Sequence, residues 1–434
     1  MMPETSESRT FTLGMVLVAW LVGLAVHVDT ALALVTAALA VCLAAMLLPP
    51  IAVVESLSPR AAARLVAVAV ATQVAALVVT ASAVAWAIGL VGVLALAQIL
   101  DLRRLRAPLI VVTCAVFGLV ASVIVRSAYQ DPRIDVYVFQ QMGAEGLLHG
   151  IDPYTPRYPN LYGPDTPVYG PGVLDAAGRL TVGFPYPPAS LLLVLPGYLL
   201  GGDVRHADVV AVAGSALVMT MAGQSAWAGL VAALFLLTPR VFYVLGHAWT
   251  EPVLVFTFSL VMLCALRWRN ALPYALGLFF ATKQTAVLAI PLVPLLLPPA
   301  QRWTAAVSMT TKALIVAAAV TAPFVLWDAH AFWRSVVQLQ FMQPLRTDAI
   351  SHLVWMHARW PEQPLLWWIP FIALVATTAA VLWRSPRSPA RFAGALTAVN
   401  LAFVAFNKQA FSNYYYFVIA TACWAAAAAV PRRA

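Results

Sequence analysis

The chain carries little charge. Asp, Glu, Lys and Arg make up 10% of its 434 residues, and only three of the 26 basic residues are lysines. Hydrophobic residues make up 62%, and the mean hydropathy is +0.86. Soluble domains contain about 25% charged and about 45–50% apolar residues. This composition therefore excludes a soluble globular protein and indicates a protein that resides in a lipid bilayer.

Cysteines are few, and the motifs of nucleotide-binding enzymes are missing. Each of the four cysteines, Cys42, Cys114, Cys264 and Cys423, lies inside an apolar run, which excludes an extracellular disulfide framework and the Cys/His spacing of a zinc site. A glycine-rich phosphate-binding loop is absent. The net charge of +9 is spread over the ends of apolar runs, so we expect it to set membrane topology and not to bind nucleic acid.

Long apolar runs fill most of the chain. A membrane-spanning helix needs about 20 mostly apolar residues. The sequence therefore predicts an all-α polytopic membrane protein with about thirteen to fifteen transmembrane helices. The expected cores are 11–28, 31–48, 63–80, 82–99, 108–126, 187–201, 208–222, 225–245, 252–266, 271–282, 284–298, 304–326, 365–383, 392–406 and 413–430. The first run lacks a small-residue cleavage site followed by polar sequence, so we expect a retained helix and not a signal peptide.

Basic residues at the ends of these runs predict the orientation, because Lys and Arg favour cytoplasmic loops. The clusters are Arg60 with Arg64, Arg103 with Arg104 and Arg106, Arg267 with Arg269, Arg384 with Arg387 and Arg391, and Arg432 with Arg433. All of them can be cytoplasmic at once. In a plasma-membrane protein the N-terminus is then cytoplasmic, and 127–186 and 327–364 are extracytoplasmic loops, with 246–252 and 407–413 on the same face.

One region conflicts with this orientation. If 187–201, 208–222 and 225–245 all crossed the membrane, the later arginines would lie on the wrong face. We therefore expect one piece between 187 and 250 to be a short or re-entrant helix. A membrane accepts such a piece only where protein or a water-filled cavity satisfies its backbone.

A polar island from Ser127 to Pro185 interrupts the apolar runs. Asp135 follows the run 108–126, and apolar residues at 134, 138, 139 and 142 have helical spacing, which predicts a short surface helix. Tyrosines then stand among prolines and glycines at Tyr154, Tyr158, Tyr162, Tyr169 and Tyr186. Tyrosines and rigid turns can form a wall for a sugar ring, although the default role of tyrosine in such proteins is at the membrane interface.

Short motifs along the chain resemble those of a known family. They are Asp135 after an outward span, Gly150-Ile151-Asp152-Pro153-Tyr154, Tyr186-Pro187-Pro188, Gly246-His247 followed by Glu251-Pro252, and Lys283-Gln284. In this order they resemble the integral-membrane GT-C glycosyltransferases, especially the polyprenol-phosphate-mannose-dependent mannosyltransferases of actinobacteria. The resemblance extends from about residue 108 to 430.

The resemblance implies a GT-C-like catalytic core over 108–434, preceded by an addition of four transmembrane helices over 1–107. Family members often place the catalytic Asp after their first span, and the matching residue would then be Asp29. Asp29 is followed by neither a surface helix nor a tyrosine-rich loop, so Asp135 is the better match.

The activity implied is transfer of a hexose, with mannose as the first choice, from a polyprenyl-phosphate carrier to a glycolipid or polysaccharide acceptor, with inversion. A carboxylate has to take the proton of the acceptor hydroxyl, and cations or donors have to stabilise the leaving phosphate. The expected base is Asp135, and the expected phosphate-binding residues are Lys283, His247, Arg346 and Lys408. The expected substrate-binding residues are Tyr137, Asp152, Tyr154, Tyr186, Glu251, Gln284, Asn413 and Tyr414.

We expect no cofactor and no metal ion, because the extracytoplasmic segments lack an Asp-x-Asp pair that would hold a divalent cation for a nucleotide sugar. Lys283 is expected to extend toward the lipid headgroups, where it would meet a phosphate.

Simpler structural roles stay open. Asp135 can cap its helix, Asp152 can form a turn before Pro153, Lys283 can mark a helix end, and Glu251 can be the partner of His247. Two other functions also stay open. One is transfer of a pentose such as arabinofuranose, and the other is a lipid-linked-sugar flippase or transporter.

Overall fold

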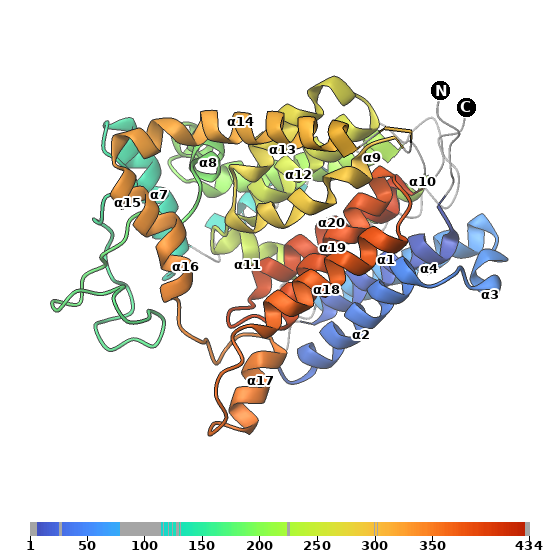
Figure 1. Ribbon diagram of the computed structural model, residues 1–434, viewed down its shortest axis with the longest axis horizontal. Coiled ribbons are helices and arrows are strands. Elements are labelled where there is room, and N and C mark those ends of the chain that lie inside the picture. Colours follow the sequence, from blue (N-terminus) through green and yellow to red (C-terminus); the bar gives the residue numbers. More distant parts are fainter. Residues whose placement is uncertain are drawn as a thin grey trace.

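A computed structural model describes residues 7–25, 28–78, ten residues between 114 and 126, residue 130, and 132–429 apart from 224, 225, 299 and 302. The expected span 82–99, the arginines of 103–106 and the final arginine pair lie outside the described residues. The described chain forms helices and no strand, with one isolated bridge between Leu174 and Leu180. This confirms the expected all-α class (Figure 1).

The helices follow the predicted apolar runs closely. The longer ones are α1 (Arg9–Leu24), α2 (Val28–Leu47), α4 (Pro59–Val78), α7 (Asp135–Leu148), α8 (Pro188–Gly201), α9 (Arg205–Gly223), α10 (Ala226–Leu236), α12 (Glu251–Leu266), α13 (Leu272–Phe280), the 3-10 helix η3 (Gln284–Leu296), α14 (Trp303–Trp327), α18 (Ile369–Arg384), α19 (Pro389–Ala405) and α20 (Ser412–Ala428). Short helices connect them: α3 (Ala52–Glu55), α11 (Arg240–Gly246), η2 (Arg269–Ala271), α15 (Ala329–Trp333), η4 (Arg334–Gln338), α16 (Leu339–Met342) and α17 (His352–Arg359).

Local sequence signals explain where many of these helices begin. Ser8, before α1, accepts a hydrogen bond from the backbone N–H of Phe11 at 3.1 Å. Ser388 does the same for Arg391 before α19, also at 3.1 Å. A side-chain acceptor at this position satisfies a backbone donor that the first turn leaves open. Proline stands in the first turn of α8, α12, α13, α18 and α19, where its missing N–H costs nothing.

Helix α20 lies at the centre of the body and packs against α1, α10, α12 and α19. Its residues from Tyr415 to Ala427 are all buried. Helix α14 is the opposite case, because only three of its 25 residues are buried although the helix is apolar. An apolar helix with an exposed surface suits contact with lipid chains.

By length and composition, two of the described helices can cross a membrane, Thr30–Leu47 within α2 and Trp303–Trp327, or up to four if each of two bent helix pairs counts as one span. Five further apolar helices have 10–17 residues. The expected total of thirteen to fifteen spans stays a prediction.

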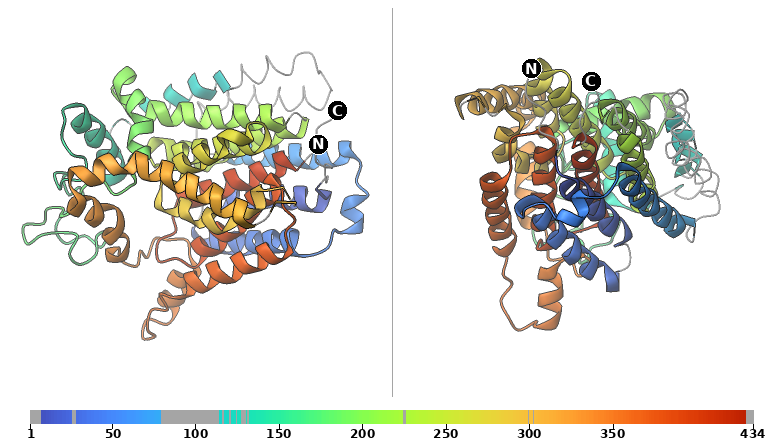
Figure 2. Two further views of the ribbon diagram at one scale, coloured as in Figure 1. Left: turned by 45° about the horizontal axis from the view of Figure 1, so that its top comes forward. Right: turned by 90° about the vertical axis from the view of Figure 1, so that its right-hand side faces the viewer.

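Polar contacts collect at two opposite ends of the body. At one end, which we call the arginine end, Arg391 pairs with Glu7 at 2.7 Å and the backbone N–H of Arg9 donates to the Glu55 carboxylate at 3.1 Å. Arg387 donates to the carbonyl of Gln301 at the base of α14, at 2.7 Å. The other end, which we call the site end, carries α7, the long loop 149–187, α15 and α16. Figure 1 shows α3 and α7 at opposite ends of the molecule, and the left view of Figure 2 agrees.

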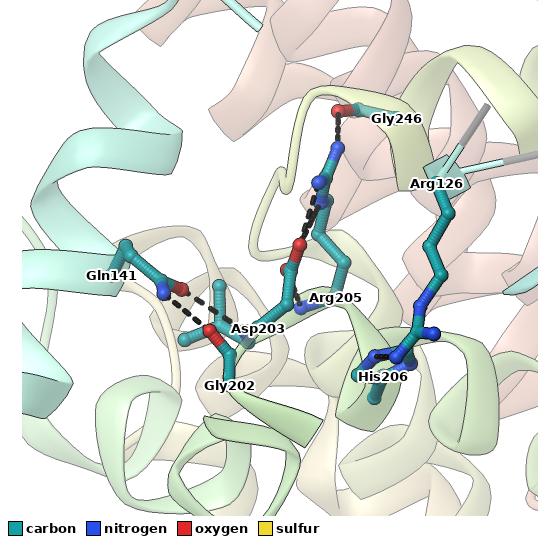
Figure 3. A network of polar contacts seen from close by, with 8 residues as sticks. Arg126, Gln141, Gly202, Asp203, Arg205, His206 and Gly246 are labelled. Atoms are coloured by element: carbon teal, nitrogen blue, oxygen red, sulfur yellow. Dashed lines mark hydrogen bonds and ion pairs between the residues drawn. The ribbon is translucent and has the colours of Figure 1, made fainter. Parts of the chain in front are cut away.

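Helix α8 begins and ends at the site end. At its start, the backbone N–H of Ala189 donates to the carbonyl of Ala281 at 3.1 Å. At its other end, Gln141 of α7 donates to the carbonyl of Gly202 at 2.6 Å, and Arg205 donates to the carbonyl of Gly246 at 3.2 Å (Figure 3). Gly202 has a φ of +71°, which suits a residue without a side chain, and the chain bends by 115° between α8 and α9.

Helix α8 therefore corresponds to the expected irregular piece between 187 and 250. Both of its ends lie at the site end, and it does not reach the arginine end. A second break, of 55°, separates α10 from α11 at Thr238 and Pro239.

Candidate functional site

Asp135 is the first residue of α7, and three donors hold its carboxylate. The backbone N–H of Val136 donates to Oδ1 at 2.8 Å, the Tyr162 hydroxyl to Oδ1 at 3.3 Å, and the Tyr169 hydroxyl to Oδ2 at 3.0 Å. The Tyr162 oxygen also accepts from the Asp135 backbone N–H at 3.1 Å. The residue before the helix, Ile134, has no capping side chain. Asp135 thus takes part in capping, but most of its contacts come from the tyrosine-rich loop.

The surroundings of Asp135 favour its protonated form more than water does. Burial raises the pKa of the carboxyl, and the hydrogen bonds from Tyr169, Val136 and Tyr162 and the positive charge of Arg346 oppose this without cancelling it. A carboxylate with a raised pKa is a stronger base than a solvated one, which suits proton removal from an alcohol.

A second cluster surrounds Lys283, in the turn between α13 and η3. Its ammonium pairs with Oε1 of Glu251, the first residue of α12, and the side-chain amide of Asn413 donates to the same oxygen at 2.9 Å. The ammonium also lies 5.3 Å from the ring centre of Tyr186 and 5.1 Å from that of Tyr414. Five of the expected site residues therefore come together here.

The position of Lys283 corrects one expectation. Lys283 is only 3% exposed and Glu251 only 1%, so the ammonium does not extend to the lipid headgroups. Electrostatic attraction accounts for this position. The turn that carries Lys283 is buried away from water, and the carboxylate of Glu251 lies within reach of the ammonium. Glu251 is thus the partner of Lys283, and the suggested pairing of Glu251 with His247 is wrong.

Tyr186 lies between the two clusters. Burial raises the pKa of its hydroxyl well above the usual value, and the negative charges of Asp135 and Glu251 raise it further. Its ring faces the Lys283 ammonium. The Asp135 carboxylate and the Lys283 cluster are therefore two sides of one region at the site end.

Arg346 and Lys408 form a third group beside these clusters. Arg346 donates through Nε and Nη2 to the two oxygens of Asp348, at 2.9 and 2.8 Å, and its charge lowers the pKa of Asp135. The backbone N–H of Arg346 donates to the carbonyl of Lys408 at 3.1 Å. The Lys408 ammonium donates to the carbonyls of Phe341 and Gln343, and burial lowers its pKa.

His247 lies farther along the same end, at the C-terminus of α11. Its Nδ1 is 2.8 Å from the carbonyl of Tyr243, and its ring stacks on Trp249. Burial lowers the pKa of the imidazole, although the bond to Tyr243 opposes this and the charge of Arg205 adds to it. A lowered pKa leaves the ring neutral at pH 7. A neutral ring has a single N–H, and here Nδ1 donates it to the Tyr243 carbonyl, so Nε2 is an acceptor and His247 offers a phosphate neither a donor nor a positive charge.

Several expected substrate-binding residues make contacts within the protein, most of them to the loop, and their substrate-binding role stays a prediction. Oδ1 of Asp152 accepts from the backbone N–H of Tyr154 at 2.9 Å, which is the turn-forming role. The hydroxyl of Tyr154 donates to the carbonyl of Tyr186 at 2.9 Å, and its ring is buried among phenylalanines. Gln284 donates to the carbonyls of Pro185 at 2.8 Å and Val336 at 3.0 Å. Tyr137 lies under the guanidinium of Arg205, at 4.7 Å.

Two features escaped the sequence analysis. Tyr162 and Tyr169 were noted as part of a tyrosine-rich loop, but nothing in the sequence indicated that both would reach Asp135. The ion pair of Arg205 with Asp203, at 2.5 Å, was missed as well, and Arg205 is 3% exposed (Figure 3). A signal was present, since an Asp and an Arg two residues apart stand directly before an apolar run.

Within the part of the chain that the structure describes, no three His, Cys, Asp or Glu side chains are grouped so as to hold a metal ion. A buried carboxylate, Asp208 of α9, is 0% exposed.

Comparisons with known proteins give a limited result. No family model matches the chain, and no curated protein matches it. Two solved structures do. One is ArnT from Cupriavidus metallidurans bound to undecaprenyl phosphate, with 20% identity and a TM-score of 0.44, and the other is the same protein in the apo state, with 18% identity and a TM-score of 0.45. Each match covers 73% of this chain and 59% of the ArnT chain, so it spans less than two thirds of ArnT.

Proposed function

We propose that this protein is a membrane glycosyltransferase that moves a sugar from a polyprenyl-phosphate carrier to an acceptor hydroxyl, with Asp135 as the base. The observation that carries the proposal is the meeting of a half-buried carboxylate of raised pKa with a cation, Arg346, and with the Lys283 cluster at one end of an apolar helical body. The order of the motifs in the sequence supports mannose as the sugar.

The reaction is a single displacement. The acceptor oxygen attacks the anomeric carbon, its proton passes to the Asp135 carboxylate, and the bond from the anomeric carbon to the phosphate oxygen breaks with both electrons going to the polyprenyl phosphate. Attack from the face opposite the leaving group inverts the anomeric centre. General-base catalysis by a positioned carboxylate contributes roughly 10²–10⁴-fold to such a rate.

Two cations compete for the role of phosphate ligand, and burial decides between them. Lys283 is bound in a buried pair, and separating the partners of such a pair costs about 3–5 kcal/mol. Arg346 is bound to Asp348, whose side chain is 59% exposed, and an exposed pair of this kind contributes about 0–1 kcal/mol. A phosphate can therefore replace Asp348 as the partner of the Arg346 guanidinium at little cost in free energy. We assign the leaving phosphate to Arg346 and assign Lys283 to the organisation of the site.

We infer the orientation of the protein in the membrane from the arginines at one of its two ends. The arginine end carries Arg9, Arg387 and Arg391, and such residues favour the cytoplasmic face. The site end then faces the extracytoplasmic side of the plasma membrane. A lipid-linked donor suits that face, where a phosphate at the headgroup level can meet Arg346.

The test compares Asp135→Asn with Asp165→Asn, an exposed carboxylate of the same loop. Purified proteins in lipid nanodiscs receive radiolabelled polyprenyl-phosphate mannose and a crude glycolipid extract, and labelled product is measured. We expect transfer by the wild type and by Asp165→Asn and a loss of at least about 100-fold with Asp135→Asn. Full activity of Asp135→Asn would remove Asp135 as the base. Absence of transfer by the wild type would reject this donor.

A further inference from the structure

Two tyrosines of the long loop share the Asp135 carboxylate. The rings of Tyr162 and Tyr169 lie 5.6 Å apart at an angle of 58°. The loop itself holds them, because the backbone N–H of Tyr162 donates to Asn160 at 3.0 Å, and Asn160 donates to the carbonyls of Gly163 at 2.8 Å and Gly178 at 3.0 Å. Their hydroxyls thus approach the carboxylate from a braced segment.

Counting acceptor sites shows what these contacts leave available. An ionised carboxylate has about four lone-pair sites, two on each oxygen. Oδ1 accepts from Val136 and from Tyr162, so both of its sites are used. Oδ2 accepts from Tyr169, so one of its sites is used, and no described residue donates to the other. The carboxylate can therefore take one more proton donor, at a defined oxygen.

We propose that Tyr162 and Tyr169 are positioning residues for the transfer reaction, holding the Asp135 carboxylate so that the remaining lone pair of Oδ2 receives the proton of the acceptor hydroxyl. This inference rests on the proposed function. Without the two hydroxyls the carboxylate could rotate about its side-chain bonds, and either oxygen could face the acceptor. A base held in a single orientation avoids this loss of alignment.

The tyrosines also favour the ionised form of the base. Burial favours the neutral acid, while the two hydroxyls donate to the charged form and stabilise it. The other groups that act on this position are Arg346, which favours the charged form of Asp135, and Tyr186, which carries no charge at neutral pH. Removing a tyrosine hydroxyl therefore raises the pKa of Asp135 further. Because only the ionised form accepts a proton, the pH below which activity falls is higher in the variant than in the wild type.

The experiment uses Tyr169→Phe, Tyr162→Phe and the control Tyr158→Phe. Tyr158 lies in the same loop, and its hydroxyl donates to the carbonyl of Pro153 at 2.8 Å, away from Asp135. Two quantities are measured in nanodiscs: the pH dependence of kcat/KM for transfer, and the infrared band of the protonated Asp135 carboxyl, identified by its absence in Asp135→Asn. The infrared titration does not depend on knowing the donor.

We expect Tyr169→Phe and Tyr162→Phe each to shift both titrations upward by about one pH unit. At a pH below the pKa, this shift corresponds to about a tenfold loss of kcat/KM. Tyr158→Phe is expected to leave both titrations unchanged. An unshifted infrared titration in the Tyr169 and Tyr162 variants would overturn the inference, and so would an equal shift in Tyr158→Phe. Transfer that survives in Asp135→Asn while the infrared shift is present would reject the proposed function instead.

Discussion

The substitution Glu251→Gln tests whether Lys283 is locked in its ion pair. In the wild type the Lys283 ammonium, with 4% of its side chain exposed, pairs with a carboxylate whose side chain is 1% exposed. The variant keeps the shape of Glu251 and removes its charge, so a buried ammonium is left without a counter-charge. Loss of one partner from a buried pair costs about 3–5 kcal/mol.

The Arg346–Asp348 pair supplies a matched comparison, because it joins the same kinds of group near the same site but is exposed. Asp348→Asn is expected to change stability by about 0–1 kcal/mol. A second comparison, Glu251→Gln with Lys283→Met, removes both charges and is expected to recover most of the stability lost by Glu251→Gln, since no uncompensated charge stays buried.

Thermal and denaturant unfolding of the purified variants in nanodiscs measures these differences. The order expected is wild type close to Asp348→Asn, then the double variant, with Glu251→Gln clearly lowest. If Glu251→Gln were as stable as Asp348→Asn, the ammonium would be able to find water or lipid phosphate without Glu251. Lys283 would then replace Arg346 as the preferred phosphate ligand.

Three further substitutions separate binding roles from structural ones. Arg346→Ala is expected to raise KM for the lipid donor by about 10–100-fold in radiolabel assays, since a charge-assisted hydrogen bond contributes about 1.5–3 kcal/mol, and a wild-type KM would exclude Arg346 as a ligand. Asp152→Asn is expected to keep transfer and stability close to wild type, because Asn forms the same turn, and loss of transfer would give Asp152 a chemical role. Arg205→Met leaves Asp203 unpaired and is expected to lower stability by about 3–5 kcal/mol in denaturant unfolding, whereas unchanged unfolding would show that the pair is accessible to solvent.

Most helix positions could be predicted from the sequence, because the signals that set them are local. The run 252–266 became α12, Glu251–Leu266, and the run 304–326 became α14, Trp303–Trp327. Apolar composition marks a helix wherever it lies in the bilayer, and proline or serine marks where several begin. The same reasoning failed to identify which run is the irregular one, since the residues of α8 are as apolar as those of the other runs.

Residue types in the site could be predicted, but their partners could not. Lys283 and Glu251 stood out as charges among apolar runs, and Asp135 stood out as a carboxylate that soon follows one. Glu251 and Lys283 are 32 positions apart and Asn413 is 162 positions from Glu251, so their contact depends on how α12, α13 and α20 pack. Sequence proximity suggested His247 as the partner of Glu251, and tertiary packing overrode it. Tyr162 and Tyr169 reach Asp135 across 27 and 34 positions, through a loop without regular structure.

The position of α8, with both of its ends at the site end, explains why these groups meet. Asp135 lies before α8, while Glu251, Lys283, Arg346 and Lys408 lie after it. Helices α9, α12, η3 and α20 each begin at the site end, and α13 and α19 return to it. If α8 crossed the body, every later helix would be reversed, and the Glu251–Lys283 pair would lie at the arginine end, a full helix length from Asp135. The 115° bend after Gly201 therefore places the carboxylate and the cations of the proposed site on one side. The contacts that hold this bend, from Gln141 to Gly202 and from Arg205 to Gly246, are accordingly as important to the site as the groups that would touch substrate.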